Sequence, residues 1–158
     1  LATIFSVFGP TPVVTQSLDL VREITPVEDN MNGLSSYNLW WMLCHYEWYM
    51  HTGDYEYLRE QKDYIAAMMR RYVTYVDENG CERLPEGRFF DWPTRGNPDQ
   101  MHAGLQGLTA LALRRGGELL VSGHVTLVSV NADRKVCRMT NDLIESCKQF
   151  FFEPESEQ

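Results

Sequence analysis

Residues 33–54 read GLSSYNLWWMLCHYEWYMHTGD, and this aromatic stretch decides the fold. Ser35 or Ser36 can cap the start of a helix, because a serine oxygen accepts from the free backbone N–H groups there. Gly53 can end that helix in a left-handed conformation, and Asp54 can cap the helix that follows. The stretch therefore predicts an aromatic helix, a tight turn and a return helix.

The aromatic residues of this helix have two interpretations. Five side chains recur at roughly helical spacing, which is typical of a buried stripe: Tyr37, Trp40, Trp41, Cys44 and Trp48. Alternatively, the N-terminal end near Tyr37 and Trp41 opens into a ligand cleft, because sugar rings stack on aromatic faces through their C–H surface. The stretch alone leaves both interpretations open.

Apolar residues at helical spacing continue through most of the chain. They predict helices over 1–8, 12–24, 36–52, 54–77, 103–121 and 124–151. The segment 119–130 also suits a β-hairpin, but its helical flanks favour a helix. The fold class is therefore predicted to be all-α, with helices joined in pairs by short turns. Such helical hairpins in series form a solenoid or a closed α/α toroid.

Composition excludes several classes of protein. The 158 residues contain 22 Asp and Glu against 14 Lys and Arg, and this net charge of -8 argues against binding to nucleic acid. No apolar run is long enough to span a membrane, and the N-terminus lacks the features of a signal peptide. The four cysteines form no Cys-x-x-Cys pair, which argues against a structural zinc site. The chain lacks an initial methionine, so we expect a processed or excised piece.

Two irregular segments are candidates for a functional loop. The polar segment 25–35 precedes the aromatic helix, and the longer segment 81–102 contains many aromatic residues. A loop of that length in a compact domain is usually functional or disordered, and its aromatic content favours function. In it, Asp91 stands beside Trp92, a pairing that suits a polyol: the ring stacks and the carboxylate binds hydroxyl groups.

Four motifs in this order resemble α-L-rhamnosidases and related six-hairpin glycosidases: GLSSYNLWW at 33–41, YMHTGDYEYL at 49–58, RFFDWP at 88–93 and HAGLQ at 102–106. The resemblance covers about residues 1–120 and fades beyond Gly123. It implies an (α/α)6 barrel of which residues 1–158 form one partial domain. It also implies hydrolysis of terminal α-L-rhamnosides with inversion, by two carboxyl groups and without a metal or organic cofactor.

The resemblance also implies roles for individual residues. The general acid is expected before residue 1 and the general base after residue 158, so no catalytic residue is assigned within the chain. The adjacent acids Glu28 and Asp29 are interpreted as solvated loop residues. The expected sugar contacts are two stacking rings, Tyr37 and Trp92, two hydroxyl ligands, Asn32 and Asp91, and two further contacts, Trp41 and His102.

Two alternatives stay open at this stage. The chain could belong to another six-hairpin glycosidase, or it could be a non-catalytic helical interaction module whose aromatic residues are all structural. Part of a barrel would expose apolar helix faces, so we also expect self-association. The expected partner is a carbohydrate that contains rhamnose; the compartment, the aglycone and the linkage preference are not decided by the sequence.

Overall fold

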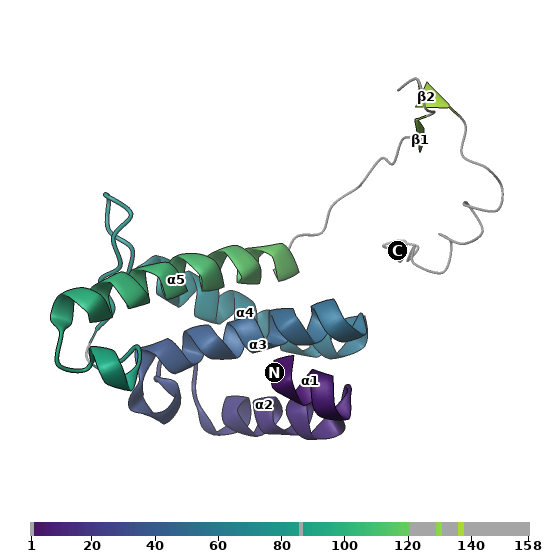
Figure 1. The fold of residues 1–158 in the computed structure, drawn as a ribbon, viewed down its shortest axis with the longest axis horizontal. Helices are drawn as coiled ribbons and strands as arrows, with labels where there is room; N and C mark the ends of the chain where they lie inside the picture. Colours follow the sequence, from purple (N-terminus) through teal and green to yellow (C-terminus); the bar gives the residue numbers. More distant parts are fainter. Residues whose placement is uncertain (1, 86, 121–128, 131–135, 138–158) are drawn as a thin grey trace. The chain divides into compact units, whose positions relative to one another are not determined.

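The computed structural model describes residues 2–85, 87–120, 129–130 and 136–137. Its contacts divide the chain into two compact units, Leu1–Val121 and Ser122–Gln158. The first unit contains five α-helices among the residues described, and this confirms the all-α class (Figure 1). They are α1 (Ala2–Phe8), α2 (Pro12–Ile24), α3 (Ser35–Thr52), α4 (Tyr55–Val73) and α5 (Pro98–Leu120), together with two short 3-10 helices, η1 (Met31–Gly33) and η2 (Trp92–Thr94).

The turn between α3 and α4 has the predicted chemistry. Gly53 adopts φ 66°, ψ 16°, the left-handed conformation that ends α3, and its N–H donates to the carbonyl of Tyr49. Asp54 caps α4 by accepting from the N–H of Tyr57. The expected serine cap of α3 is wrong: Leu34 occupies that position, and the helix begins directly at Ser35.

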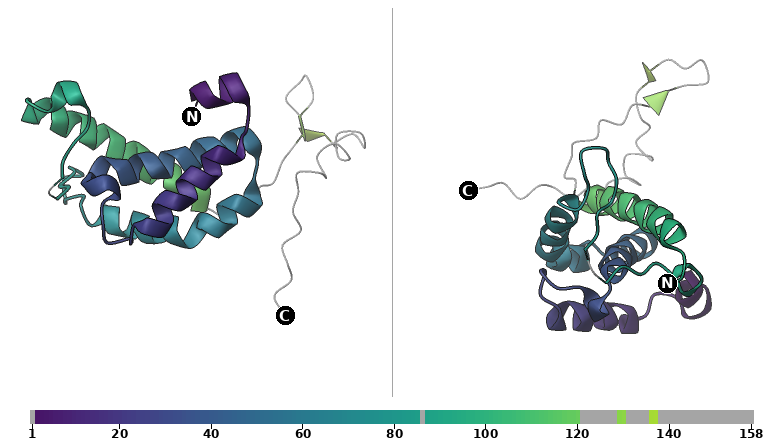
Figure 2. Two further views of the ribbon diagram at one scale, coloured as in Figure 1. Left: turned by 90° about the horizontal axis from the view of Figure 1, so that it is seen from below. Right: turned by 90° about the vertical axis from the view of Figure 1, so that its left-hand side faces the viewer.

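Helix α3 lies at the centre of the first unit, with α2, α4 and α5 around it (Figure 2). This position explains why it is buried on more than one side. Trp41 and Trp48 are buried as the stripe predicts, but Tyr37 and Trp40 are 39% and 46% exposed. Leu39, Met42 and Leu43, which lie outside the predicted stripe, are buried instead.

Most of the apolar core lies where α3, α4 and α5 meet. Its fully buried members include Leu39 and Met42 of α3, Ile65 and Met68 of α4, and Leu105 of α5. Burial of an aliphatic side chain of this size contributes roughly 1.5–3 kcal/mol to folding. The core therefore fixes the relative positions of the helices that carry the candidate site.

A buried polar network fastens α2 to α3 and α4. The Nδ1 of His45 lies 2.9 Å from the Trp41 carbonyl, so this nitrogen carries the proton, and the Nε2 lies 3.4 Å from the hydroxyl of Tyr57. That hydroxyl donates to Asp19 at 3.1 Å, and Gln61 donates to the same carboxylate at 2.9 Å. Burial lowers the pKa of His45 to about 4, so the ring is neutral near pH 7.

Helix α5 begins earlier than predicted. The sequence interpretation starts this helix near residue 103, whereas the structure starts it at Pro98. Asn97 supplies the cap, because its side-chain oxygen accepts from the N–H of Gln100 at 3.1 Å. Proline directly after the cap is also favoured, so the missed signal was Asn97-Pro98.

The second unit corrects one prediction. Strand β1 (Ser129–Val130) pairs antiparallel with strand β2 (Val136–Cys137). The predicted helix over 124–151 is therefore wrong at these four residues. Four of the six residues at 125–130 are valine or threonine, and β-branched side chains favour strands. The rest of that helix prediction falls outside the described residues.

Candidate functional site

The start of α3 and the segment before it form the first part of the candidate site. Asn32 is exposed in η1 and adopts φ 53°, ψ 26°, a left-handed conformation that asparagine tolerates. Buried Asn38 holds this segment: its side chain accepts from the N–H of Met31 at 2.9 Å and donates to the carbonyl of Asp29 at 3.1 Å. The backbone that carries Asn32 is thus tied to the first turn of α3.

The guanidinium of Arg71 on α4 fixes the same segment from the other side. It donates to the carbonyls of Val27 at 2.9 Å and Asp29 at 2.7 Å, and to the side-chain oxygen of Asn30 at 2.8 Å. Hydrogen bonds from a charged donor are stronger than neutral ones. The side chains of Glu28 and Asp29 are exposed, in agreement with their interpretation as solvated acids.

The loop between α4 and α5 contacts the start of α3. The N–H of Ser35 donates to the carbonyl of Gly87 at 3.3 Å. Gly87 has φ +84°, and a Cβ atom at this position would overlap the carbonyl oxygen of Gly33. Only glycine permits both this conformation and this close approach of two backbones. The loop and the segment that contains Asn32 therefore meet at one end of the helices.

Asp91 and Trp92 lie at the next turn of this loop. A carboxylate oxygen of Asp91 accepts from the N–H of Trp92 at 2.7 Å, and Asp91 and Thr94 form a capping box around η2. The Trp92 side chain is 71% exposed. Its ring contacts Phe89 edge-on, with centroids 5.3 Å apart, and the guanidinium of Arg95 lies 5.5 Å from its centroid. Contacts with Phe89 and Arg95 thus hold the indole ring of Trp92 at an exposed position.

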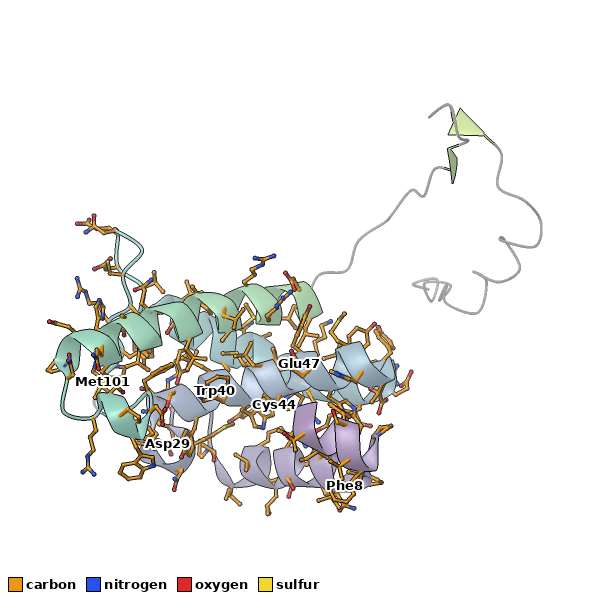
Figure 3. All side chains as sticks on the ribbon, viewed as in Figure 1. Phe8, Asp29, Trp40, Cys44, Glu47 and Met101 are labelled. Carbon is orange, nitrogen blue, oxygen red and sulfur yellow. The ribbon has the colours of Figure 1, made fainter. Side chains whose placement is uncertain are left out.

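Phe90 anchors the same loop to α5. Its ring lies so close to Gly104 that a Cβ atom there would stand 2.5 Å from a ring carbon. Glycine at this helical position therefore provides the space in which the ring packs. This contact places Asp91 and Trp92 beside the first turns of α5, the end of the unit marked by Met101 and Asp29 in Figure 3.

A buried carboxylate forms the polar centre of the loop. The side chain of Glu82 is 0% exposed and contacts both the guanidinium of Arg88 and the Nδ1 of His102, the latter at 2.6 Å. Arg88 binds both carboxylate oxygens, and the N–H of Leu84 donates to one of them at 3.0 Å. Gln106 of α5 accepts from the N–H of Glu82 itself at 2.7 Å.

These contacts determine the charge of Glu82. Burial alone would raise the pKa of this carboxyl group, because it disfavours the charged form. The hydrogen bonds from Arg88, the Leu84 N–H and His102 outweigh that effect, so the pKa lies below its ordinary value. Glu82 is therefore a carboxylate at neutral pH, beneath an arginine and a histidine that are 32% and 41% exposed.

The structure brings most of the predicted sugar contacts to one end of the first unit. Asn32 and Tyr37 lie at the start of α3, Asp91 and Trp92 lie in the loop that touches this start, and His102 lies in the second turn of α5. Trp41 is different: it is 4% exposed, and its indole N–H donates to the carbonyl of Leu18 at 3.0 Å. In this structure Trp41 packs in the core.

Sequence reasoning missed Glu82 and its partner Arg88. Arg88 stands within the quoted motif RFFDWP, but only its neighbours were assigned a role. Glu82 sits in an ordinary polar context, Cys-Glu-Arg, and no local signal distinguishes it from a solvated acid. Its burial depends on Arg88, six positions later, and on His102, twenty positions later.

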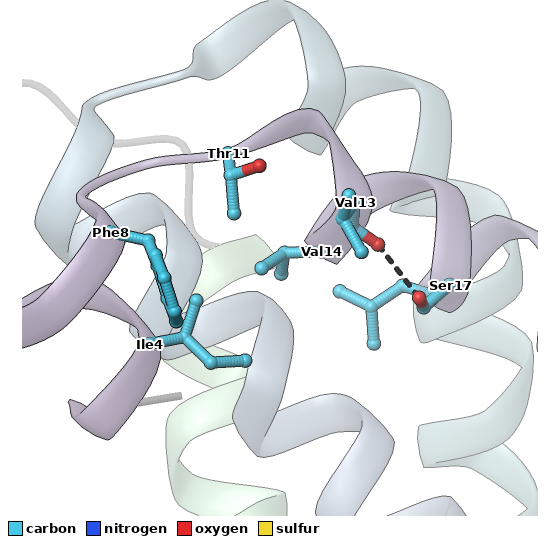
Figure 4. Close-up of a pocket in the computed structure, with 7 residues that line it drawn as sticks. Ile4, Phe8, Thr11, Val13, Val14 and Ser17 are labelled. Atoms are coloured by element: carbon cyan, nitrogen blue, oxygen red, sulfur yellow. Dashed lines mark hydrogen bonds between the residues drawn. The ribbon is translucent and has the colours of Figure 1, made fainter.

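Two concave regions lie elsewhere in the first unit. A groove of about 670 Å³ lies between α1 and α2 and is mainly apolar; its lining includes Ile4, Phe8, Val13 and Val14 (Figure 4). A second hollow of about 640 Å³ is lined by residues that include Trp48, His51 and Tyr57. Neither contains any of the six predicted sugar contacts.

Within the part of the chain that the structure describes, no cluster of three His, Cys, Asp or Glu side chains could hold a metal ion. No described helix is both long and apolar enough to cross a bilayer. Comparison with family models, with curated proteins and with solved structures gives no match.

Proposed function

We propose that this chain is part of the catalytic domain of an α-L-rhamnosidase-like glycoside hydrolase with an (α/α)6 barrel. Its consecutive helices joined by short turns, α1 with α2 and α3 with α4, are compatible with successive hairpins of such a barrel. The loops before α3 and before α5 then belong to one rim, where Asn32, Tyr37, Asp91, Trp92 and His102 contribute to a sugar pocket.

The observation that carries this proposal is the exposed indole of Trp92 beside the carboxylate of Asp91. An exposed tryptophan held by Phe89 and Arg95 offers a flat apolar face, which suits the C–H surface of a sugar ring. The adjacent carboxylate offers acceptors to hydroxyl groups. Both suit a terminal rhamnose, which has a 6-methyl group as well as three free hydroxyl groups.

In this proposal the chain binds sugar but does not supply the catalytic carboxyl groups. Inversion needs an acid that protonates the leaving oxygen and a base that activates water on the opposite face of the ring. Glu82 is unsuited to either role, since its two oxygens are already bound by Arg88, His102 and Leu84. The acid and the base are expected on parts of the barrel that precede and follow this chain.

The full-length protein that contains this chain provides the test. It should hydrolyse an aryl α-L-rhamnoside, and proton NMR should show β-L-rhamnose as the first product, since the mechanism inverts the anomeric centre. Initial formation of the α anomer would contradict the two-carboxylate inverting mechanism. An open reading frame that begins at residue 1 and ends at residue 158 would contradict the partial domain.

One observation suits a second candidate, a helical interaction module, as well as a partial barrel. Exposed apolar side chains gather on α1 and α2, where Phe8 and Ile24 are 76% and 72% exposed, and a groove runs between the two helices. Such faces mark interaction surfaces. This candidate predicts a stable monomer that binds another protein through the apolar face, whereas a partial barrel should self-associate through it. Sedimentation of the 158-residue chain at several concentrations distinguishes the two.

A further inference from the structure

The proton on His102 can be located from its surroundings. Its Nδ1 lies 2.6 Å from a carboxylate oxygen of Glu82 and 3.4 Å from Nη2 of Arg88. If Nδ1 accepted from Arg88, the short contact with Glu82 would require a protonated carboxyl group. Glu82 is instead ionised, because Arg88 and the Leu84 N–H both donate to it. The proton therefore lies on Nδ1, and it is donated to Glu82.

The position of this proton determines how the His102 ring can hydrogen-bond to a ligand. In the neutral imidazole only one nitrogen carries a proton, and its hydrogen bond determines the role of the other. With Nδ1 protonated, Nε2 has a free electron pair. His102 is 41% exposed and stands on the same end of the unit as Asp91 and Trp92, whereas Glu82 is completely buried. Glu82 can therefore influence a ligand only through the ring of His102.

We propose that Glu82 is a positioning residue that fixes His102 in its Nδ1–H form, so that Nε2 accepts a hydrogen bond from a sugar hydroxyl at the rim. This inference rests on the proposed function for the identity of the ligand. Nε2 of His102 would thus add an acceptor on α5 to the carboxylate of Asp91, which lies in the loop before that helix. The contact of Gln106 with the Glu82 N–H fixes the backbone from which the carboxylate projects.

The tautomer can be measured without any ligand. Long-range proton–nitrogen NMR spectra of the 158-residue chain, recorded where the imidazole is neutral, show which ring nitrogen is protonated. The His102 signals are assigned by their loss in His102→Gln. We expect Nδ1–H in the natural chain and a shift of the major form to Nε2–H in Glu82→Ala. A major Nε2–H form in the natural chain would overturn the inference, even if Glu82→Ala does not fold.

A control separates this effect from a general change in the loop. Asp77 also binds an arginine, Arg83, at 2.9 Å, and it accepts from backbone N–H groups of the same loop. These contacts of Asp77 do not involve His102. Asp77→Asn should therefore leave the tautomer unchanged. An equal response of His102 to Asp77→Asn and to Glu82→Ala would assign the effect to loop disorder and overturn the positioning role.

The sugar contact is tested in the full-length protein. His102→Ala should raise KM for an aryl rhamnoside by about two- to tenfold, the range expected for one lost hydrogen bond. Glu82→Ala should raise KM similarly, but it should have little further effect in a His102→Ala background, because it acts through that ring. Additive effects of the two substitutions would overturn the inference.

The NMR spectra and the kinetic measurements together distinguish failure of this inference from failure of the proposed function. If Trp92→Ala impairs hydrolysis while His102→Ala leaves KM unchanged, the rhamnosidase proposal stands and the His102 contact is refuted. If the full-length protein does not hydrolyse rhamnosides, the proposed function fails. The NMR spectra of the chain then still decide whether Glu82 sets the tautomer of His102.

Discussion

The backbone N–H of Ser35, the first residue of α3, donates to the carbonyl oxygen of Gly87 in the loop before α5. This single hydrogen bond joins two segments that lie 52 positions apart in the sequence. It brings the end of the central aromatic helix to the loop that carries Asp91 and Trp92. Both parts of the candidate sugar site are therefore held by one backbone contact and by the packing of Phe90 on α5.

The packing of Phe90 gives the first prediction. Gly104→Ala should displace the ring, because the new Cβ atom would lie 2.5 Å from a ring carbon. We expect a loss of roughly 1–3 kcal/mol in the free energy of unfolding, as for other overpacked sites. Gly107→Ala is the matched control on the same helix, since its added Cβ would meet no atom within 4 Å apart from its chain neighbours and the surrounding helix backbone. It should stabilise the chain by up to about 1 kcal/mol through helix propensity.

Urea denaturation of the two variants measures this difference. Equal stabilities for Gly104→Ala and Gly107→Ala would show that Phe90 does not pack on α5 as described. The loop would then lack the anchor that places Asp91 and Trp92 beside the helix.

The second prediction concerns the buried carboxylate. Glu82→Gln removes the buried negative charge that pairs with Arg88. The guanidinium then lacks an ionised partner. Since Arg88 is about one-third exposed, water compensates part of the loss, and we expect a destabilisation of about 2–3 kcal/mol. Thermal unfolding of the natural chain and the variant measures this destabilisation.

Glu118→Gln is the control for this prediction. Glu118 also binds two arginines, Arg114 and Arg115, but at an exposed position. Ion pairs of this kind contribute little to stability, so its unfolding temperature should hardly change. An equally small effect of Glu82→Gln would contradict the burial of the Glu82 cluster.

The third prediction is a pH dependence caused by His45. Burial is the main cause that lowers its pKa from 6.5 to about 4, although the Trp41 carbonyl and Asp19 oppose the shift. Between these two pH values the unfolded chain binds a proton that the folded chain excludes. Stability is therefore complete above pH 6.5 and falls as the pH decreases, by about 3 kcal/mol at pH 4 from this group alone.

His45→Phe should remove this part of the pH dependence, because phenylalanine does not titrate and its ring can occupy the same space between Trp41 and Tyr57. His51 lies on the same helix but is exposed, so His51→Gln should retain the dependence. Denaturation curves at several pH values between 4 and 7 measure the slopes. An unchanged slope in His45→Phe would show that the ring is not buried as a neutral group.

The sequence predicts the first unit well because its signals are local. Gly53 and Asp54 define the turn between α3 and α4 by their own conformation and hydrogen bonds. The exposure of Tyr37 and Trp40 could not be predicted in this way, since it depends on which sides of α3 the other helices cover. The same holds for Trp41, whose aromatic ring suits a sugar contact but whose N–H is bound by Leu18 of α2.

The candidate site shows a similar division. Asp91 and Trp92 are adjacent in sequence, so their pairing is visible before the fold is known. The Glu82 cluster instead requires Arg88 and His102 to converge on one carboxylate, and this is a property of the tertiary structure. In the second unit, the β-branched residues near 125–130 favour strands. The prediction of a helix there gave more weight to the helical pattern on either side than to this local preference.

The most direct measurement is hydrolysis of an aryl α-L-rhamnoside by the full-length protein and its Trp92→Ala and Asp91→Asn variants. Tyr55→Ala is the control, since this ring is 43% exposed but lies at the other end of α3, beyond Gly53. We expect kcat/KM to fall at least about tenfold in both site variants, without unfolding, and to change little in the control. Unchanged kinetics in both site variants would contradict the sugar site.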